Sequence, residues 1–385
     1  MKIIVSGQSY PEKRNILVNE QHTYVDFKYK NVWLYLNKIR QKAVKANKSF
    51  IFQPVSFLMP GNVEIIHLFN EVARTSKRWV STFETELPRV LPVPGVPKLA
   101  NPELKKQLRL VAAPQCVAII AISEATRQIQ LKLLSAFPEE ASAITPKLHK
   151  LHPPQPVLYE GQRSAQERKL IFTFAGNEFY RKGGAEVVLA FTELVNEGKV
   201  SAETVQVNLI GNLKRRYNFA HGRYQDEEAF YQKIEQLLNA SAVFNHAESQ
   251  PNNALIDLFK RSHAGLLPTW QDTYGFSVLE MQACGCPVIS TNVRALPEIN
   301  PPEAGWIIPC PLSDMFELTI NSANDKEAIR QLIVSHLKTC ILAILADRET
   351  LMLRSQGALK RIRDVHDPAR FREKLNDIYA LSAVR

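Results

Sequence analysis

The stretch Leu267–Ser290, LPTWQDTYGFSVLEMQACGCPVIS, decides how the rest of this chain is interpreted. Its apolar runs predict a buried strand, a polar loop, a short helix and a second strand. Two carboxylates, Asp272 in the loop and Glu280 on the helix, stand with seven residues between them. Gly275 allows the backbone to approach a ligand closely, and Ser277 is expected to cap the helix.

This segment suits a ligand that has hydroxyl groups at both ends and a diphosphate in the middle. Each carboxylate can accept hydrogen bonds from a sugar hydroxyl. The first amides of the predicted helix, near Phe276 and Ser277, would point toward an anion. An ordinary helix with a surface glutamate in an α/β domain is the alternative interpretation.

The same segment resembles the acidic-x7-acidic signature of retaining GT-B glycosyltransferases of family GT4, the glycogen-synthase-like and mannosyltransferase-like group. Members carry a Glu-Gly-Phe-Gly loop followed by Leu-Glu-Ala-Met-Ala-x-Gly-x-Pro-Val. Here the loop is Asp272-Thr-Tyr-Gly-Phe276, followed by Leu279-Glu-Met-Gln-Ala-Cys-Gly-Cys-Pro-Val288. The resemblance is strong over residues 160–300 and rests on organisation alone elsewhere.

The resemblance implies an α/β chain with the GT-B fold, in which two Rossmann-like domains face each other across a cleft and a C-terminal helix returns to the first domain. It implies transfer of a hexose, with retention of configuration, from a nucleotide-diphosphate sugar to a hydroxyl of a glycan or a lipid-linked acceptor. The family works without a metal or another cofactor, so none is expected.

A second motif, Gly176-Asn-Glu-Phe-Tyr-Arg-Lys-Gly-Gly184, follows a predicted strand. Cations beside a closely approaching backbone suit a diphosphate. The family places a Gly-Arg pair and a Lys-Gly pair here for that purpose. Lys182 matches the second pair, but Asn177 stands where the family has arginine, so Arg181 is expected to supply the other charge. A solvated Arg-Lys pair before a helix is the alternative.

The resemblance also implies roles for individual residues. Glu280 would hold the ribose hydroxyls, and Asp272 would hold hydroxyls of the transferred sugar. Lys182 and Arg181 would stabilise the departing diphosphate. The other expected donor-binding residues are Gly176, Asn177, Gly211, Asn245, Gly275, Phe276 and Ser277.

The first half of the chain offers two candidates for a further catalytic residue. Family members carry a histidine near the reacting carbon, after the strand that is predicted here at residues 79–83. This chain has Glu84 at that place. His67, at the end of a strand predicted at residues 63–67, is the second candidate. Each can equally be a strand-end polar residue without a role. Ser6 and its neighbours are expected near the acceptor.

A chain of 385 residues is too long for one core, so two domains are expected. The predicted division is an acceptor-side domain at 1–158, a nucleotide-sugar-binding domain at 159–364, and a helix at 365–385 that packs back on the first domain. Short apolar runs separated by helices predict a mostly parallel sheet in each domain. The predicted strands are residues 2–5, 50–53, 63–67, 79–83, 116–122, 170–175, 205–210, 242–244, 264–267 and 288–291.

Positive charge is concentrated in the first half. Residues 1–150 hold 22 Lys and Arg against 11 Asp and Glu, and the whole chain carries a net charge of +10. Residues 30–46 predict an amphipathic helix, interpreted as a solvated surface helix or as a contact for an anionic membrane or acceptor at residues 30–48. The cations of this segment are Lys30, Lys38, Arg40, Lys42, Lys45 and Lys48.

Other chemistries lack their motifs. The sequence has no Asp-x-Asp for a GT-A-type metal site, no dinucleotide or P-loop glycine motif, and no Gly-x-Ser-x-Gly. No nucleic-acid motif accompanies the basic residues, so nucleic acid is not an expected partner. The five scattered cysteines and the absence of an apolar leader after Met1 indicate a cytoplasmic protein, peripheral at the membrane if the basic helix binds there.

Two other functions stay open. A GT-B sugar-nucleotide 2-epimerase would share the fold but would not be expected to carry this acidic pair. A non-catalytic homologue that binds a glycan or an anionic membrane is suggested by the replacement of the family arginine with Asn177 and of the family histidine with Glu84.

Overall fold

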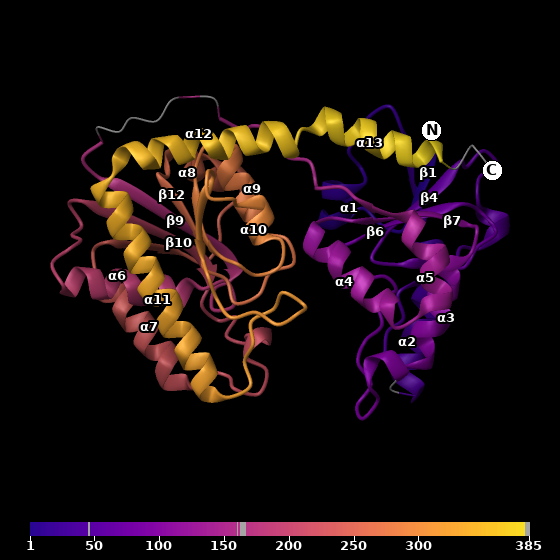
Figure 1. Cartoon of the computed structure of the whole chain (residues 1–385), viewed down its shortest axis with the longest axis horizontal. Coiled ribbons are helices and arrows are strands. Elements are labelled where there is room, and N and C mark those ends of the chain that lie inside the picture. The colour runs from indigo at the N-terminus through magenta and orange to yellow at the C-terminus, as the bar shows by residue number, and fades with distance from the viewer. Residues whose placement is uncertain (45–46, 160, 162–166, 382–385) are drawn as a thin grey trace. The chain divides into compact units, whose positions relative to one another are not determined.

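The chain folds into two α/β units in a computed structural model that describes residues 1–44, 47–159, 161 and 167–381. The first unit comprises Met1–Pro154 and His366–Arg385, and the second comprises Gln155–Val365 (Figure 1). The division therefore falls at Pro154, inside the proline-rich linker, rather than at residue 158.

The first unit is built on a parallel sheet of six strands in the order β2-β1-β4-β6-β7-β8. A separate parallel pair, β3 with β5, lies outside this sheet. The strands are β1 (Lys2–Val5), β2 (Thr23–Asp26), β3 (Ile51–Phe52), β4 (Ile65–Phe69), β5 (Val72–Ala73), β6 (Trp79–Phe83), β7 (Cys116–Ala121) and β8 (Leu148–Lys150).

Helices cover both faces of this sheet, which is why its central strands are apolar on both sides. Helices α3, α4 and α5 pack on one face, and α13 packs on the other through Phe371, Leu375, Ile378 and Tyr379. The helices of the unit are α1 (Tyr10–Asn15), α2 (Val32–Val44), α3 (Pro102–Ala112), α4 (Glu124–Ser135), α5 (Pro138–Ile144) and α13 (Pro368–Ala380), with short 3-10 turns η1 (Lys28–Lys30), η2 (Ser56–Leu58), η3 (Lys98–Ala100) and η4 (Thr145–Lys147).

The second unit is a parallel sheet of six strands in the order β11-β10-β9-β12-β13-β14, with helices on both faces. This is the doubly wound order of a Rossmann fold, and it reverses direction between β9 and β12. The elements are β9 (Leu170–Glu178), α6 (Gly184–Asn196), β10 (Val205–Asn212), α7 (Glu228–Ala240), β11 (Phe244–Ala247), α8 (Asn252–Arg261), β12 (Ala264–Leu267), α9 (Phe276–Ala283), β13 (Val288–Thr291), α10 (Leu296–Ile299), β14 (Gly305–Ile308), α11 (Ala323–Ala346) and α12 (Arg348–Val365).

Most of the strands that the apolar pattern missed, or placed at different residues, lie at sheet edges. Strands β2, β8 and β14 are edge strands that the apolar pattern missed, and edge strand β11 begins two residues after the start predicted for it. An edge strand is covered on fewer sides than a central one, so it does not need a continuous apolar run.

Helix α11 passes the length and composition test for a membrane span. In this structure it packs against α6 and buries Ile333, Leu337 and Ile341. The same helix carries Arg330 into the interior of the second unit.

His67 corrects one sequence expectation. Strand β4 runs to Phe69, two residues beyond the predicted strand end, so His67 lies within the strand and has no exposed surface. Its Nδ1 lies 2.6 Å from the hydroxyl oxygen of Tyr379, and its Nε2 lies 2.8 Å from Oγ1 of Thr82. Burial lowers the pKa of His67 to about 3, so the ring is neutral. His67 therefore connects α13 to the sheet by hydrogen bonds rather than facing a ligand.

The contact between His67 and Tyr379 predicts the effect of removing the tyrosine hydroxyl. Tyr379→Phe leaves a buried nitrogen of His67 without its partner, so the free energy of unfolding should fall by about 1–3 kcal/mol in chemical denaturation. The control Tyr217→Phe, at an exposed tyrosine, should change it by less than about 0.5 kcal/mol. A Tyr379→Phe chain as stable as the parent would contradict the tie.

Candidate functional site

The candidate site lies where the strand order of the second unit reverses. The loops after β9 and β12 leave the sheet on either side of this point, and open α/β sheets bind ligands in the crevice formed there. The β9 loop leads through Arg181 and Lys182 into α6. The β12 loop leads through Asp272 into α9. The two sequence motifs are thus neighbours in space.

A buried ion pair joins the two loops. Nζ of Lys182 lies 2.6 Å from Oδ2 of Asp272, and the two side chains are only 17% and 12% exposed. Oδ1 of Asp272 accepts hydrogen bonds from the backbone N–H groups of Tyr274 and Gly275, at 3.3 and 3.1 Å. Burial raises the pKa of Asp272, but the charge and hydrogen bond of Lys182 outweigh this effect and hold it below its ordinary value. Asp272 is therefore a fixed anion whose oxygens already hold the loop.

Two glycines allow these loops to meet. Gly183 has φ +87, and a Cβ atom added there would lie 2.1 Å from the carbonyl oxygen of Pro268. Gly275 has φ +92 and is the residue that caps α9. The expected cap, Ser277, instead lies inside the first turn and makes no capping bond. The helix begins earlier because Asp272 and the left-handed Gly275 turn the chain directly into it.

Arg181 braces the two loops. Its guanidinium donates to the carbonyl oxygen of Gln271 at 2.8 Å and pairs with Glu178. Its own carbonyl oxygen accepts a hydrogen bond from the backbone N–H of Trp270 at 2.9 Å. The guanidinium thus bonds two groups of the protein, and its predicted role toward the diphosphate stays a prediction.

A further cation near this site escaped the sequence analysis. Arg215 is exposed on the loop that follows β10. Burial raises the pKa of Glu178, but its bond to Arg181 and the charges of Arg181, Lys182 and Arg215 bring it below the ordinary value. Arg215 therefore adds positive charge beside the β9 loop. The sequence did hold one indication of this role, because Arg215 lies in the loop that follows a predicted strand.

Helix α9 offers a partly exposed face. Phe276, Ser277 and Glu280 are partly exposed, and their spacing places them together on the helix surface. Val278 and Leu279, which lie between them in sequence, are buried. The helix therefore presents one polar acidic face while its apolar residues pack inward.

The remaining predicted residues divide into two groups. Gly176, Asn177 and Gly211 lie at the carboxyl ends of β9 and β10, where a Cβ atom added to Gly211 would lie 2.4 Å from the carbonyl oxygen of Gly176. Asn245 is the second residue of edge strand β11, and its amide nitrogen lies 3.4 Å from Oδ1 of Asn208. Its side chain contacts β10 rather than the Lys182–Asp272 pair.

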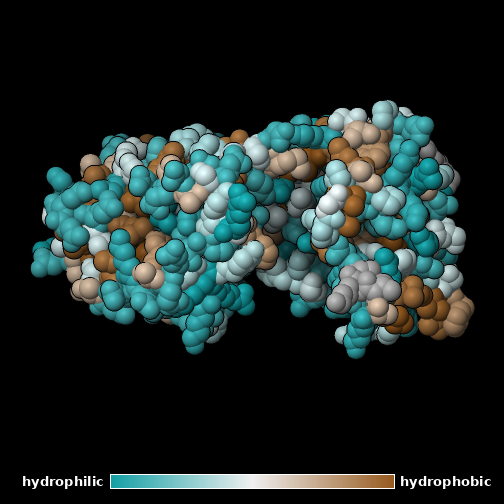
Figure 2. Space-filling model, turned by 90° about the horizontal axis from the view of Figure 1, so that it is seen from below, coloured by the Kyte–Doolittle hydropathy of each residue, from teal (hydrophilic) through white to brown (hydrophobic). Residues whose placement is uncertain are grey.

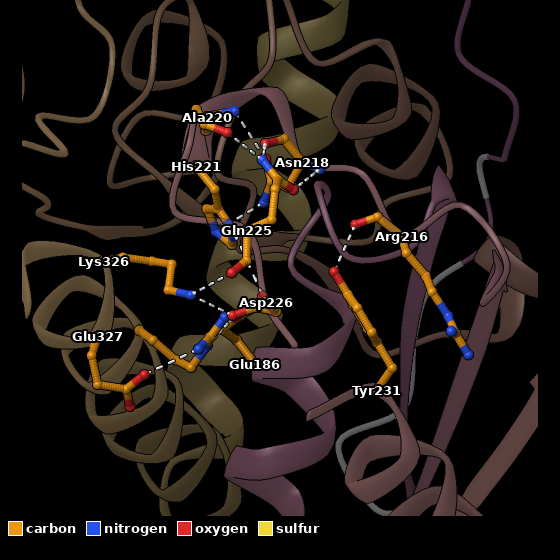
Figure 3. Close-up of polar contacts among 12 residues, drawn as sticks. Glu186, Arg216, Asn218, Ala220, His221, Gln225, Asp226, Tyr231, Lys326 and Glu327 are labelled. Atoms are coloured by element: carbon orange, nitrogen blue, oxygen red, sulfur yellow. Dashed lines mark hydrogen bonds and ion pairs between the residues drawn. The ribbon is translucent and has the colours of Figure 1, made fainter. Parts of the chain in front are cut away.

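A buried charge cluster lies beneath these loops (Figure 3). The guanidinium of Arg330 pairs with Glu186 of α6 at 3.1 Å and with Asp226 of the β10–α7 loop at 2.7 Å. Lys326 pairs with Asp226 at 2.7 Å. These pairs connect α11 to helix α6 and to the β10–α7 loop.

The β12–α9 loop joins the same cluster through aromatic packing. The ring of Trp270 lies 5.7 Å from the guanidinium of Arg330 and 4.4 Å from the ring of His221, which it meets edge-on. Burial lowers the pKa of His221 to about 4 against the opposing charge of Asp226, so His221 is neutral. Trp270 stands two residues before Asp272, so the cluster positions the loop that carries the ion pair.

A second ion pair near Asp272 also escaped the sequence analysis. Arg294 follows β13, has φ +51, and pairs with Glu317 at 2.6 Å. Burial raises the pKa of Glu317 and the charge of Asp272 adds to the shift, although Arg294 opposes it. A non-glycine residue held in the left-handed region is a strained position of the kind found at functional sites.

In the first unit, Glu84 lies at the carboxyl edge of the sheet, directly after β6. Its Oε1 accepts a hydrogen bond from Nδ2 of Asn70 at 3.1 Å, and its backbone N–H donates to Oδ1 of Asn70 at 3.1 Å. Glu84 is partly buried. The structure therefore places it at the predicted edge, bonded to the residue that follows β4.

Comparison with known proteins bears on this site. Residues 159–335 match the family described as glycosyl transferases group 1. The second unit belongs to this family. The chain is 21% identical over 248 residues to the D-inositol 3-phosphate glycosyltransferase of Gordonia bronchialis, covering 62% of this chain and 53% of that protein. The chain thus spans about half the length of that curated relative.

Solved glycosyltransferase structures share the architecture of both units. A glycosyltransferase from Rickettsia africae matches with a TM-score of 0.58 at 14% identity, over 100% of this chain and 90% of that one. A trehalose-6-phosphate synthase matches with a TM-score of 0.59 at 13% identity, over 100% and 99%. Sucrose-phosphate synthase from Thermosynechococcus elongatus matches with a TM-score of 0.54 at 15% identity, over 94% and 81%. The chain has the GT-B fold, as predicted.

The Lys182–Asp272 ion pair predicts that changes at these two residues have coupled effects on the free energy of unfolding. Lys182→Met leaves a shielded Asp272 carboxylate without its cation and should lower the free energy of unfolding by about 2 kcal/mol at pH 7, less than for a fully buried pair. Because the pKa of Asp272 is lowered, its contribution should be present above about pH 3.8 and vanish as the pH falls below it.

The double variant Lys182→Met with Asp272→Asn provides the control, since neither charge remains. It should recover most of the lost free energy in chemical denaturation. Equal losses for the single and double variants would contradict the expectation that Asp272 is destabilising once its cation is removed.

Proposed function

We propose that this chain is a retaining glycosyltransferase of the cytoplasm that transfers a hexose from a nucleotide-diphosphate sugar to a hydroxyl of a glycan or lipid-linked acceptor, without a metal. The carrying observation is the Lys182–Asp272 pair at the point where the strand order reverses, followed at once by the first amides of α9 and by Glu280. Family membership of this unit supports the activity.

The donor would use the groups that converge at this edge. The ammonium group of Lys182 has three N–H donors. One donates to Asp272, which leaves two for diphosphate oxygens. The first amides of α9 add a partial positive charge. Glu280 would accept the ribose hydroxyls, and Asp272 would keep Lys182 oriented while it faces the transferred sugar. Arg215 would strengthen the positive potential around the diphosphate.

Transfer would follow from stabilising the departing diphosphate. The bond from the anomeric carbon to the phosphate oxygen breaks as the bond to the acceptor oxygen forms on the same face. The acceptor proton passes to the departing phosphate oxygen, so no nucleophile on the enzyme is required. Lys182 and the α9 amides would act because negative charge grows on the diphosphate in this step.

The role of Glu280 predicts a loss of donor affinity. Glu280→Gln removes the charge that accepts two hydroxyls, so donor binding should weaken by about 1.5–3 kcal/mol in calorimetry with the best donor of a nucleotide-sugar panel. Glu203→Gln, an exposed glutamate elsewhere in the second unit, should leave the affinity unchanged. Equal affinities for Glu280→Gln and the parent chain would remove Glu280 from the donor site.

The same panel separates the alternative functions. A glycosyltransferase should slowly hydrolyse one nucleotide sugar to free sugar and nucleoside diphosphate. A 2-epimerase would convert the donor to its epimer without releasing the nucleotide. A non-catalytic homologue would bind a glycan or a membrane and turn over no donor, in keeping with Asn177 and Glu84 at the two positions that depart from the family.

We further propose that an anionic membrane is a partner of the first unit, at what we call the basic apolar surface. Helix α2 exposes apolar residues, with Leu36 38% and Ile39 61% exposed, and Phe57 of the adjoining η2 turn is 87% exposed. Apolar residues gather on the surface of this unit (Figure 2). The basic apolar surface comprises Tyr29, Lys30, Tyr35, Leu36, Lys38, Ile39, Lys42, Phe57 and Leu58.

Backbone hydrogen bonds hold this surface together. The N–H of Val32 donates to the carbonyl oxygen of Gln53 at 2.9 Å, which brings the start of α2 beside the chain that leads into η2. Arg40 lies over the ring of Trp33 and contributes less to the exposed charge. Lys45 lies outside the described residues. Exposed apolar side chains among lysines suit a negatively charged bilayer.

The basic apolar surface predicts salt-sensitive vesicle binding. Changing Lys30, Lys38 and Lys42 together to glutamine should weaken sedimentation with phosphatidylserine vesicles by about 3 kcal/mol at low salt, at about 1 kcal/mol for each lysine. The parent chain should lose binding as salt rises toward 1 M, where the screening length is about 3 Å.

A matched variant tests whether position matters. Three lysines elsewhere in the first unit, Lys13, Lys106 and Lys132, are exposed and can be changed to glutamine with the same loss of charge. Their replacement should weaken binding much less. Equal effects of both triple variants, or vesicle binding that does not depend on salt concentration, would indicate that α2 is an ordinary solvated surface helix.

A further inference from the structure

The loop between β10 and α7, residues 213–227, exposes two aromatic side chains that we call the aromatic pair. Tyr217 is 57% exposed and Phe219 is 63% exposed. Their ring centroids lie 4.9 Å apart, and the two ring planes meet at 88°. Aromatic side chains contribute strongly to binding when a partner covers them, so an exposed pair on one loop is typical of an interaction surface.

Hydrogen bonds inside the loop hold the aromatic pair in place (Figure 3). The side-chain oxygen of Gln225 accepts from the backbone N–H of Asn218 at 3.0 Å, and its amide nitrogen donates to the carbonyl oxygens of Asn218 and Gly222 at 2.8 and 2.7 Å. Asn218, which stands between the two aromatic residues, is 1% exposed, and its Oδ1 accepts from the backbone N–H of Ala220 at 3.1 Å. The loop thus has a buried polar interior and an aromatic exterior.

Contacts with α7 and α11 fix the two ends of the loop. Near its start, Arg216 pairs with Glu228 at 2.5 Å and with Glu235 at 3.3 Å, both on α7. Near its end, Asp226 pairs with Lys326 of α11 at 2.7 Å. A loop that is fixed in this way loses little conformational entropy when its side chains bind a partner.

Positive charge surrounds the aromatic pair. Lys214, Arg215 and Arg223 of the same loop are exposed, and none of them forms an ion pair with a carboxylate among the described residues. Of the two acids in residues 213–227, Asp226 is paired with α11, and Glu227 lies at the start of α7. The surface therefore combines exposed rings with uncompensated cations, which suits an anionic partner.

The side chains of this loop favour a glycan over a bilayer or a nucleic acid. A bilayer takes up aliphatic side chains, as on the basic apolar surface, whereas the large apolar side chains exposed here are both aromatic. A flat nucleobase stacks parallel to a single ring, and rings at 88° cannot both stack on it. A puckered sugar ring carries C–H groups on its faces and its edge, so it can contact both rings of such a corner.

We propose that the aromatic pair and the cations around it form a binding site for an anionic glycan, whose sugars carry carboxylate, phosphate or sulfate groups. Tyr217 and Phe219 contact the C–H groups of the sugar rings. Lys214 and Arg223 bind the anionic groups, and the planar guanidinium can hold two oxygens of one group at once.

The place of this loop indicates which glycan it holds. The loop leaves the carboxyl end of β10, at the same edge of the sheet as the Lys182–Asp272 pair. The charge of Arg215 acts on Glu178 at the end of β9, so the loops after β9 and β10 are neighbours. We therefore assign the glycan to the acceptor of the transfer reaction, and this assignment rests on the proposed function.

Glycan binding can be measured on the full chain without a nucleotide sugar. Hexagalacturonic acid, a hyaluronan hexasaccharide and a chondroitin sulfate hexasaccharide are anionic probes, and maltohexaose is a neutral probe of the same length. In calorimetry at low salt, the parent chain should bind at least one anionic probe more tightly than maltohexaose. Changing Tyr217 and Phe219 together to alanine should weaken that binding about tenfold, the usual effect of losing two aromatic contacts.

The cations predict a second effect. Changing Lys214 and Arg223 together to glutamine should remove most of the preference for the anionic probe over maltohexaose. Raising the salt concentration should weaken binding of the anionic probe to the parent chain, because salt screens exposed charges.

A matched variant tests whether position matters. Tyr29→Ala with Phe57→Ala removes the same two residue types from the basic apolar surface, where both are exposed. This variant should bind the anionic probe like the parent chain. Tyr217→Ala with Phe219→Ala should in turn sediment with phosphatidylserine vesicles like the parent chain. Unchanged midpoints of thermal unfolding would show that both variants fold.

Three outcomes would overturn the proposal. The first is failure of the parent chain to bind any anionic probe, or equal binding by the parent and the variant that lacks the aromatic pair. The second is equal affinity for maltohexaose and the anionic probes, because the cations would then have no role. The third is tighter binding of oligothymidylate that is lost in the same variant, which would assign the loop to nucleic acid.

This proposal and the proposed function fail in different ways. Probe binding requires neither a donor nor turnover, so it can succeed even if no nucleotide sugar is hydrolysed. An active chain that binds no anionic probe would sink this inference alone. Probe binding by a chain that hydrolyses no nucleotide sugar would keep the glycan site and remove its assignment to an acceptor.

Discussion

The buried guanidinium of Arg330 is the contact on which the carboxyl edge of the second unit depends. It pairs with Glu186 and Asp226 and lies 5.7 Å from the ring of Trp270, so one side chain of α11 reaches α6 and the two loops that carry Asp226 and Trp270. Burying so many charges yields little net stability compared with an apolar cluster. Its benefit is a single arrangement of these elements, because without Arg330 the buried Glu186 carboxylate would lose its cation, and Asp226 would keep only Lys326.

Each sheet has a carboxyl group beside the point where its strand order reverses, and the pKa values of these two groups are shifted in opposite directions. In the second unit, Lys182 lies 2.6 Å from Asp272 and holds that carboxyl group ionised. In the first unit, burial raises the pKa of the Glu71 carboxyl group to about 7, although Ser6 and the charges of Lys48 and Lys28 oppose the rise. The balance between burial and neighbouring positive charge thus sets the pKa of each carboxyl group.

Much of the second unit was predictable because its motifs are local in sequence. Asp272, Gly275 and Glu280 fall within nine residues, and the pattern itself fixed strand, loop and helix. The errors have physical causes. A strand end displaced by two residues changed His67 from a candidate ligand into a core residue, and edge strands lacked the apolar run that marks central ones.

The contacts that escaped prediction are long-range. Arg330 meets Glu186 across 144 positions of sequence, and no spacing rule connects them. Arg181 was expected to supply charge to the diphosphate, but its hydrogen bond to Gln271 spans 90 positions of sequence and requires the two loops to lie side by side. Glu71 carries no motif at all. It lies beside a reversal of strand order only because β1 and β4 are neighbours in the first sheet, which a one-dimensional pattern does not contain.

The tie between His67 and Tyr379 has a consequence for how the protein is made. The first unit is completed by a helix that is synthesised after the second unit, because α13 supplies Phe371, Leu375 and Tyr379 to a sheet face formed by residues that precede the second unit. While the ribosome makes the second unit, that apolar face lacks the cover of α13. The second unit is contiguous in sequence, so all of its residues are available for folding before α13 can complete the first unit.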